Sequence, residues 1–201
     1  MAIAQKRLPL IEDFLGELKR FIFNRVRQDE QAARLATGIF AALKTTKTGQ
    51  PALPRHFPVC KRLSEAVQAI PRDQEDTASL GNSLRALDSF IPWTRRPNSS
   101  DDDPKFEAAH ANVMLVGPNG IEPREDVWIG VSIMAPHVTY PNHHHPPQEI
   151  YAVLSPGQWR QANGPWSEPG TGGLVYNPPN IVHAMRSGDH CLLAVWALLA
   201  E

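Results

Sequence analysis

The chain has 201 residues, a length that suits one domain or a small barrel with a helical extension. Hydrophobic residues make up 42% of it, which excludes global disorder, and the formal net charge of -1 argues against a nucleic-acid partner, because phosphate binding needs clustered Lys and Arg. No apolar run approaches the roughly 20 residues of a membrane-spanning helix and no signal peptide is seen, so we expect a cytoplasmic protein without a membrane partner.

Apolar residues in the first half of the chain recur at helical spacing. The clearest stripe follows i, i+3, i+4, i+7 and consists of Ile11, Phe14, Leu15, Leu18, Phe21, Ile22 and Val26. Further helices are predicted over residues 31–43, 61–70 and 77–90. We interpret these stripes as core, and a stripe left uncovered could pack against a second copy in a homodimer.

The pattern changes near residue 105. Residues 91–105 are rich in Pro, Ser and Asp, a composition typical of a loop or linker. Beyond them short strands are predicted over residues 111–116, 127–134, 149–154, 158–161, 173–176, 181–185 and 192–196. Gly and Pro separate most of them, which favours a small antiparallel sandwich or barrel. The sequence therefore predicts a helical extension over residues 1–105, packed on a mainly β domain over residues 106–201.

Histidines concentrate in the predicted β domain, where six of the eight lie between His137 and His190. Because side chains alternate along a strand, the odd-numbered His143, His145, Glu149 and Tyr151 could converge on one interior, with Ile150 facing the other side. His183, on a late strand, supplies a distant ligand. Imidazole with carboxylate suits one divalent metal such as Zn, Fe, Mn, Co or Ni, with a coordination position left open for catalysis.

This arrangement resembles the cupin superfamily over roughly residues 125–197, which implies a jelly-roll-like antiparallel barrel. The first cupin motif, HxH followed by Glu and a later Gly, is matched by His143, His145, Glu149 and Gly157, with the glycine one place late. The second motif is matched by Gly173, Pro178 and His183, whereas Asn180 and Ser187 stand where the pattern has Gly and Asn.

The run from Tyr140 to Tyr151 resembles more closely the cupin-type dimethylsulfoniopropionate lyases of the DddQ type, as do the chain length and the N-terminal helical segment. The resemblance implies cleavage of dimethylsulfoniopropionate by β-elimination into dimethyl sulfide and acrylate. It also implies four metal ligands, namely His145, Glu149, Tyr151 and His183. Tyr140 and His143 correspond to substrate-pocket residues. The general cupin pattern would instead make His143 a ligand, and here we follow the lyase pattern.

The proposed substrate is a small zwitterion. Its carboxylate can occupy an open metal position, and a metal-bound tyrosine can lose its proton and act as a base. We expect Tyr151 to be that base, with Tyr140 as the alternative. Its sulfonium cannot accept hydrogen bonds but is attracted to aromatic faces. Such faces are available in the barrel half from Trp128, Trp159, Trp166, Trp196, Tyr140 and Tyr176. Of these, we expect Trp196 to form a substrate wall.

Two other functions are compatible with the same barrel. One is an Fe(II) dioxygenase acting on another small carboxylate, although such an enzyme does not need a tyrosine beside the metal. The other is a non-catalytic metal- or ligand-binding cupin, which would bind a ligand without turnover. Oxygen consumption would identify the first, and binding without turnover would identify the second.

Overall fold

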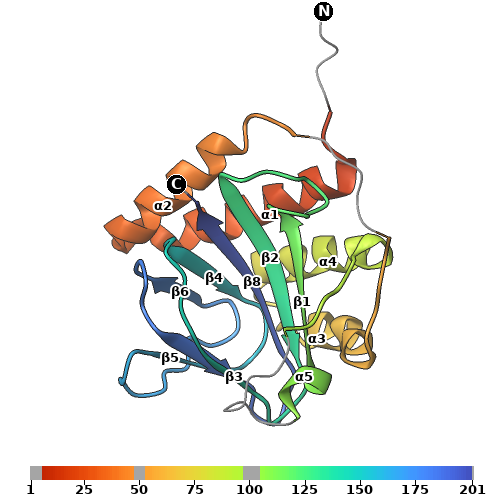
Figure 1. Ribbon diagram of the computed structural model, residues 1–201, viewed down its shortest axis with the longest axis vertical. Coiled ribbons are helices and arrows are strands. Elements are labelled where there is room, and N and C mark those ends of the chain that lie inside the picture. The colour runs from red at the N-terminus through yellow and green to blue at the C-terminus, as the bar shows by residue number, and fades with distance from the viewer. Residues whose placement is uncertain (1–5, 48–52, 97–104, 201) are drawn as a thin grey trace, which may run out of the picture.

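The computed structural model describes residues 6–47, 53–96 and 105–200 (Figure 1). Its helices are α1 (Pro9–Arg25), α2 (Glu30–Ala42), α3 (Leu63–Gln68), α4 (Glu75–Leu87) and α5 (Phe106–Ala109), with 3-10 turns η1 (Val26–Gln28), η2 (Pro58–Arg62) and η3 (Asp88–Phe90). Local chemistry explains the helix starts: Pro9 occupies the first turn of α1, and the Asp29 side chain caps α2 by accepting from two backbone N–H groups. None of the described helices is long and apolar enough to cross a membrane.

Two antiparallel sheets follow the helices. Their strands are β1 (His110–Val116), β2 (Val127–Met134), β3 (Thr139–His143), β4 (Glu149–Val153), β5 (Gln158–Gln161), β6 (Leu174–Asn177), β7 (His183–Arg186) and β8 (Leu192–Leu199). One sheet has the order β1-β2-β8-β4-β6 and the other β3-β7-β5. Each strand predicted from the sequence is present within a few residues, and β3 is an additional one. Helices hold 35% and strands 27% of the described residues.

The five-stranded sheet is covered on both faces. On one side lies a larger core, built from helical residues such as Phe14 and Leu18 together with Ile150 and Ala152 of β4. On the other side lies a smaller core, to which β4 contributes Tyr151 and Val153 and the facing sheet contributes residues such as Met185 and Trp159. Figure 1 shows the helices gathered beside this sheet and the shorter strands across from them. The predicted alternation along residues 149–154 is therefore confirmed.

A buried ion-pair network joins the helical segment to the sheets. The Glu122 carboxylate pairs with Arg7 and Arg124, whose guanidinium groups are almost fully buried. Arg124 also donates to the carbonyl oxygens of Ala42 (2.9 Å) and Thr45 (3.0 Å), at the C-terminal end of α2. The Ala42 carbonyl ends α2 and has no partner within the helix, so it accepts from Arg124 and also from the Thr45 N–H at 3.2 Å. The network therefore fixes α2 against the barrel.

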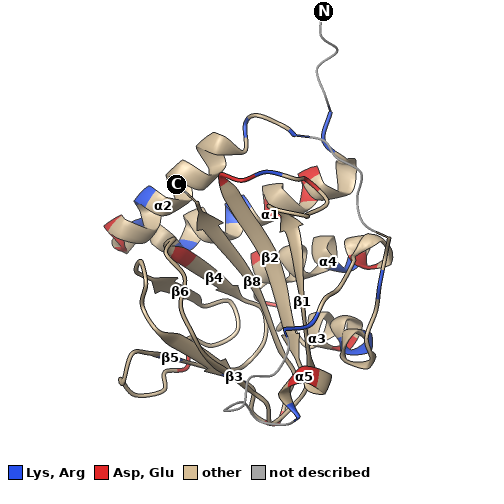
Figure 2. Ribbon diagram, in the orientation of Figure 1, with Lys and Arg blue, Asp and Glu red and all other residues tan. Residues whose placement is uncertain are grey.

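Charged side chains lie mainly outside the strands. Figure 2 shows Lys and Arg interspersed with Asp and Glu along the helices and connections, whereas most strand residues are uncharged. The run of acidic residues at 101–103 lies outside the described residues, as does most of the predicted linker. The strands thus enclose an interior with few charged side chains, in which a small group of polar residues forms the site described next.

Candidate metal centre and its cavity

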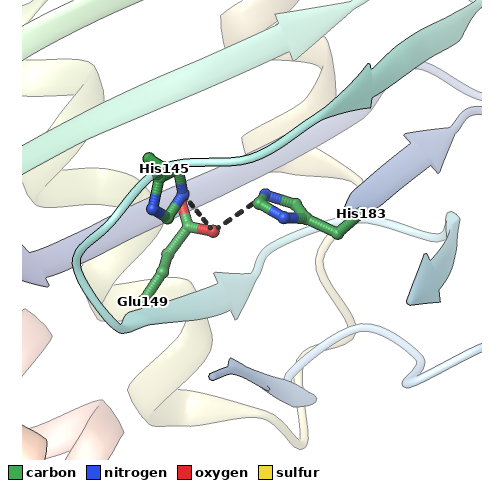
Figure 3. A group of neighbouring side chains, drawn as sticks. All are labelled: His145, Glu149 and His183. Carbon is green, nitrogen blue, oxygen red and sulfur yellow. Dashed lines mark ion pairs between the residues drawn. The ribbon is translucent and has the colours of Figure 1, made fainter. Parts of the chain in front are cut away.

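Three predicted metal ligands meet between the two sheets. His145 lies in the loop after β3, Glu149 begins β4 and His183 begins β7. One potential ligand atom from each lies within 4.8 Å of the others (Figure 3). The strand register explains the convergence, because His143 of β3 pairs with His183 of β7 and so brings the loop after β3 to the start of β7.

Each histidine of the group is oriented by its own loop. The Nδ1 atom of His145 lies 2.8 Å from the carbonyl oxygen of Pro147, and that of His183 lies 2.9 Å from the carbonyl oxygen of Ile181. A carbonyl only accepts, so Nδ1 carries the proton and donates, which leaves a lone pair on Nε2 of each neutral ring. Both rings thereby present Nε2 as a ligand atom, held in the way that metal-binding histidines usually are.

The Nε2 atoms need either a proton or a cation between them and Glu149. They lie 3.3 Å (His145) and 3.2 Å (His183) from Glu149 Oε2, buried and without a hydrogen-bond partner among the described residues (Figure 3). Two lone pairs facing a carboxylate oxygen repel it, and unpartnered buried polar atoms are costly. Extra protons on the rings would satisfy this arrangement. A divalent cation would do so as well, and two imidazoles with one carboxylate are a common donor set for it.

The Glu149 carboxylate is positioned from the neighbouring strand. Asn177, the last residue of β6, is fully buried and donates its Nδ2 to Glu149 Oε2 at 2.8 Å. The Asn177 Oδ1 atom in turn accepts from Gln161 at 2.8 Å. Burial raises the pKa of Glu149, but when His145 and His183 are protonated their hydrogen bonds and positive charges outweigh burial and hold this pKa at about 2. Glu149 is therefore an anion at neutral pH.

The predicted site tyrosines and His143 lie beside this group. Tyr151 is buried, and its ring centroid lies 6.3 Å from that of His183. Burial, and next the Glu149 charge, raise the pKa of Tyr151 well above its ordinary value. The His143 ring lies 4.1 Å from His183 and 4.8 Å from Tyr140, and burial followed by the His183 charge lowers its pKa to about 4. His143 is outside the group of three ligand residues, whereas His144 is exposed.

One cavity of about 170 Å³ joins these residues. It is lined by Asn112, Met114, Trp128, Ser132, Tyr140, His143, His145, Glu149, Tyr151, Trp196 and Leu198. The predicted pocket residues Tyr140, His143 and Trp196 are thus together, and among the described residues no Lys or Arg lines the cavity. Its volume fits a small molecule with few heavy atoms, and Glu149 is the one acidic side chain among its described lining residues.

Trp196 belongs to β8 and packs against the neighbouring strand β2. Its Nε1 donates to Ser132 Oγ at 3.2 Å, and its partner in the strand register is Gly130. A Cβ atom on Gly130 would stand 2.2 Å from the Trp196 ring and 2.1 Å from the Val113 carbonyl oxygen, so only glycine leaves room for the indole there. Trp128 also lines the cavity, whereas Trp159 belongs to the smaller core.

Several residues of the site were not anticipated from the sequence. Asn177 stands directly before Pro178 in the second cupin motif, but no local pattern marks it as the partner of Glu149. Asn112 and Ser132 sit on β1 and β2, within runs that read as ordinary apolar strands. Only the pairing of strands distant in the chain brings them to the cavity.

Comparison with known proteins relates the chain to one enzyme family. Residues 31–194 match the family model described as dimethylsulfoniopropionate lyase. DddQ of Ruegeria pomeroyi, a dimethylsulfoniopropionate lyase, is 26% identical over 159 residues, which cover 78% of this chain and 77% of that protein. DddL of Cereibacter sphaeroides, which carries a provisional dimethylsulfoniopropionate lyase name, is 32% identical over 87 residues, and the match spans 42% of this chain and only 37% of DddL.

Solved structures agree with this relationship at the level of the fold. The crystal structure of DddQ from Ruegeria pomeroyi matches with a TM-score of 0.73 at 22% identity, covering 97% of this chain and 93% of that one. A structure from work on the lyases RdDddP and RnDddQII matches with a TM-score of 0.72 at 19% identity, covering 95% and 92%. With the antiparallel sheets described above, these matches confirm the predicted fold of a cupin-type barrel preceded by helices.

Proposed function

We propose that this chain, which belongs to the dimethylsulfoniopropionate lyase family of carbon–sulfur lyases, cleaves dimethylsulfoniopropionate into dimethyl sulfide and acrylate with the help of one divalent metal. One observation carries the proposal: the potential ligands His145 and Glu149 and two tyrosines line a single small cavity, with His183 completing the ligand group. The helical segment, residues 1–105, is proposed to be an extension of the barrel of residues 106–201, because both supply the larger core.

The residues proposed to hold the metal are His145, Glu149 and His183, with Tyr151 as a fourth ligand. The unpartnered Nε2 atoms and the anionic Glu149 support the first three. Such a cation, whether Zn, Fe, Mn, Co or Ni, would favour the phenolate form of Tyr151 and offset negative charge that develops on the substrate carboxylate.

Tyr151 is proposed to act as the base. Its phenolate oxygen removes the proton on the carbon next to the substrate carboxylate, and the electron pair of that C–H bond forms the new C=C bond. The bond from the next carbon to sulfur breaks, and its electron pair stays on sulfur, so neutral dimethyl sulfide leaves and acrylate remains. The proton on Tyr151 returns to water afterwards. Tyr140 is proposed to bind the substrate, and remains the alternative base.

The sulfonium end is proposed to lie against Trp196. The Trp196 N–H already donates to Ser132. A sulfonium, which cannot accept a hydrogen bond, therefore leaves no unpaired donor on Trp196. An aromatic face attracts a cation by about 0.5–2 kcal/mol. The same indole face therefore selects for a cationic, weakly hydrated group.

A headspace assay for dimethyl sulfide tests the proposal. Purified protein is loaded with each metal in turn and compared with chelated protein, with Tyr151→Phe and with Tyr176→Phe, a tyrosine outside the cavity lining. We expect metal-dependent release that falls at least about 100-fold in Tyr151→Phe, the minimum usual for a general base, and survives in Tyr176→Phe. No release with any metal would refute the lyase function, and oxygen uptake by the iron-loaded protein would then favour the dioxygenase alternative.

A further inference from the structure

The Tyr140 ring is held in place by aromatic neighbours and by a guanidinium group. The ring lies 4.9 Å from Phe106 in an edge-on contact and 4.8 Å from His143, measured between centroids. The Arg96 guanidinium lies 5.6 Å from the ring centroid. The side chain is only 8% exposed, and both Tyr140 and Asn112 line the cavity. What remains to be set is the direction of the hydroxyl proton.

Asn112 of β1 provides a hydrogen bond that helps to set this direction, beside the Arg96 guanidinium, whose charge and hydrogen bond also act on the Tyr140 hydroxyl. Its Nδ2 donates to the Tyr140 hydroxyl oxygen at 3.1 Å. The backbone of Asn112 is itself fixed, because its N–H and C=O both pair with Thr94 at 2.9 Å and 2.7 Å. Asn112 faces Ser132 of β2 in the strand register. The amide therefore approaches Tyr140 from a defined strand position and not from a mobile loop.

A phenol oxygen that accepts from an amide N–H must direct its own proton elsewhere. We propose that Asn112 is a positioning residue, which binds the Tyr140 oxygen and so turns the Tyr140 hydroxyl proton into the cavity, towards the carboxylate of the substrate. This inference rests on the proposed function, since it assigns a partner to one end of the proposed substrate. Tyr140 is then a hydrogen-bond donor to the carboxylate, and Asn112 acts only through it.

The carboxylate needs such a donor on the protein. No Lys or Arg is among the described residues that line the cavity, whereas the acidic residue Glu149 is one of them. A carboxylate has two oxygens. If one of them occupies an open metal position, the other still needs a hydrogen-bond donor. A neutral hydroxyl donor can serve the other without adding charge, and a charge-assisted bond of this kind is stronger than one between neutral groups.

A double-mutant cycle tests the inference. The kcat and KM for dimethylsulfoniopropionate are measured for the wild type, Asn112→Ala, Tyr140→Phe and the double variant, all loaded with the same metal. We expect Asn112→Ala to lower kcat/KM about tenfold in the wild-type background, as for loss of one hydrogen bond, and by less than about twofold in Tyr140→Phe. The same loss in both backgrounds would overturn the inference, because Asn112 would then act independently of Tyr140.

Two further variants separate positioning from structure. Asn112→Leu keeps the approximate shape without a donor, so it should match Asn112→Ala and not the wild type. Asn82→Ala is the control, because Asn82 is an exposed asparagine on α4 that also makes a side-chain hydrogen bond, with Arg85 at 3.1 Å. It should retain wild-type kinetics. Full activity in Asn112→Leu would refute the donor role.

Binding of acrylate gives a readout that does not depend on turnover. Calorimetry with acrylate should show weaker binding for Asn112→Ala and for Tyr140→Phe, without a further loss in the double variant. A wild type that binds acrylate in this coupled way but releases no dimethyl sulfide would refute the proposed function and leave the Asn112 inference standing. A wild type that releases dimethyl sulfide, with additive effects of the two substitutions, would refute the inference alone.

Discussion

The hydrogen bond from Asn177 to Glu149 should determine how tightly the site holds a metal. Replacing Asn177 by Leu keeps a similar volume but removes the donor that lies 2.8 Å from Glu149 Oε2. A buried hydrogen bond to a charged group contributes about 1.5–3 kcal/mol. If this whole contribution is lost from the metal-bound state, the affinity of the site for the metal falls about 10- to 100-fold, since about 1.4 kcal/mol is a factor of ten. The same range is typical of partners that orient metal ligands.

Competition with a chromophoric chelator at neutral pH measures that affinity. The control is Asn142→Leu, the same substitution at an exposed position of β3 whose Oδ1 accepts a hydrogen bond from Arg160 at 3.0 Å. We expect this control to bind metal like the wild type. If Asn177→Leu also stays within about threefold of the wild type, Glu149 does not depend on the neighbouring strand for its orientation, and the reasoning is wrong.

Three further changes should have effects of predictable sign. The Arg25 hydrogen bond outweighs burial and lowers the pKa of Asp76 to about 2, so the pair stabilises the fold by at most about 2 kcal/mol above pH 4 and loses this as pH falls through about 2. Urea titrations of Asp76→Asn should lack this acid-dependent part, and an unchanged pH dependence would contradict it. Arg124→Met should lower the free energy of unfolding by about 3–5 kcal/mol, because it leaves Glu122 buried with one guanidinium fewer. A loss under 1 kcal/mol in urea unfolding would disprove that role. Trp196→Leu should raise KM about 2- to 30-fold with little change in kcat, as expected for loss of a cation–π contact, and an unchanged KM would remove Trp196 from the substrate wall.

The shared face of Glu149, a proposed ligand, and Tyr151 could be predicted because strand periodicity is a local property. Once β4 is recognised, Glu149 and Tyr151 must share a face and Ile150 must take the other, and both cores bear this out. The strand β3 was harder to recognise. Its five residues include Pro141, two exposed positions and no run of apolar residues, so neither composition nor alternation marks it as a strand.

The positioning residues could not be predicted, because their contacts depend on which strands pair. Asn177 reaches Glu149 only because β6 lies beside β4, with these two residues as register partners. Asn112 reaches Tyr140 across 28 positions of sequence, through β1 and β3 of different sheets. A single sequence carries propensities for each strand but not the order of strands in a sheet, and an isolated asparagine in a strand has no periodic signature.

The ligand group thus combines two kinds of control. His145 and His183 are oriented by carbonyls two residues away in their own loops, so their ring directions are set by short-range geometry. Glu149 is oriented by Asn177, which belongs to another strand and depends on the sheet register. A disturbance of the β4–β6 pairing should therefore displace the carboxylate while leaving both imidazoles in place. Metal affinity and the position of Tyr151, which lies on the same strand as Glu149, would then change together, so the ligand and the proposed base are coupled through one pair of strands.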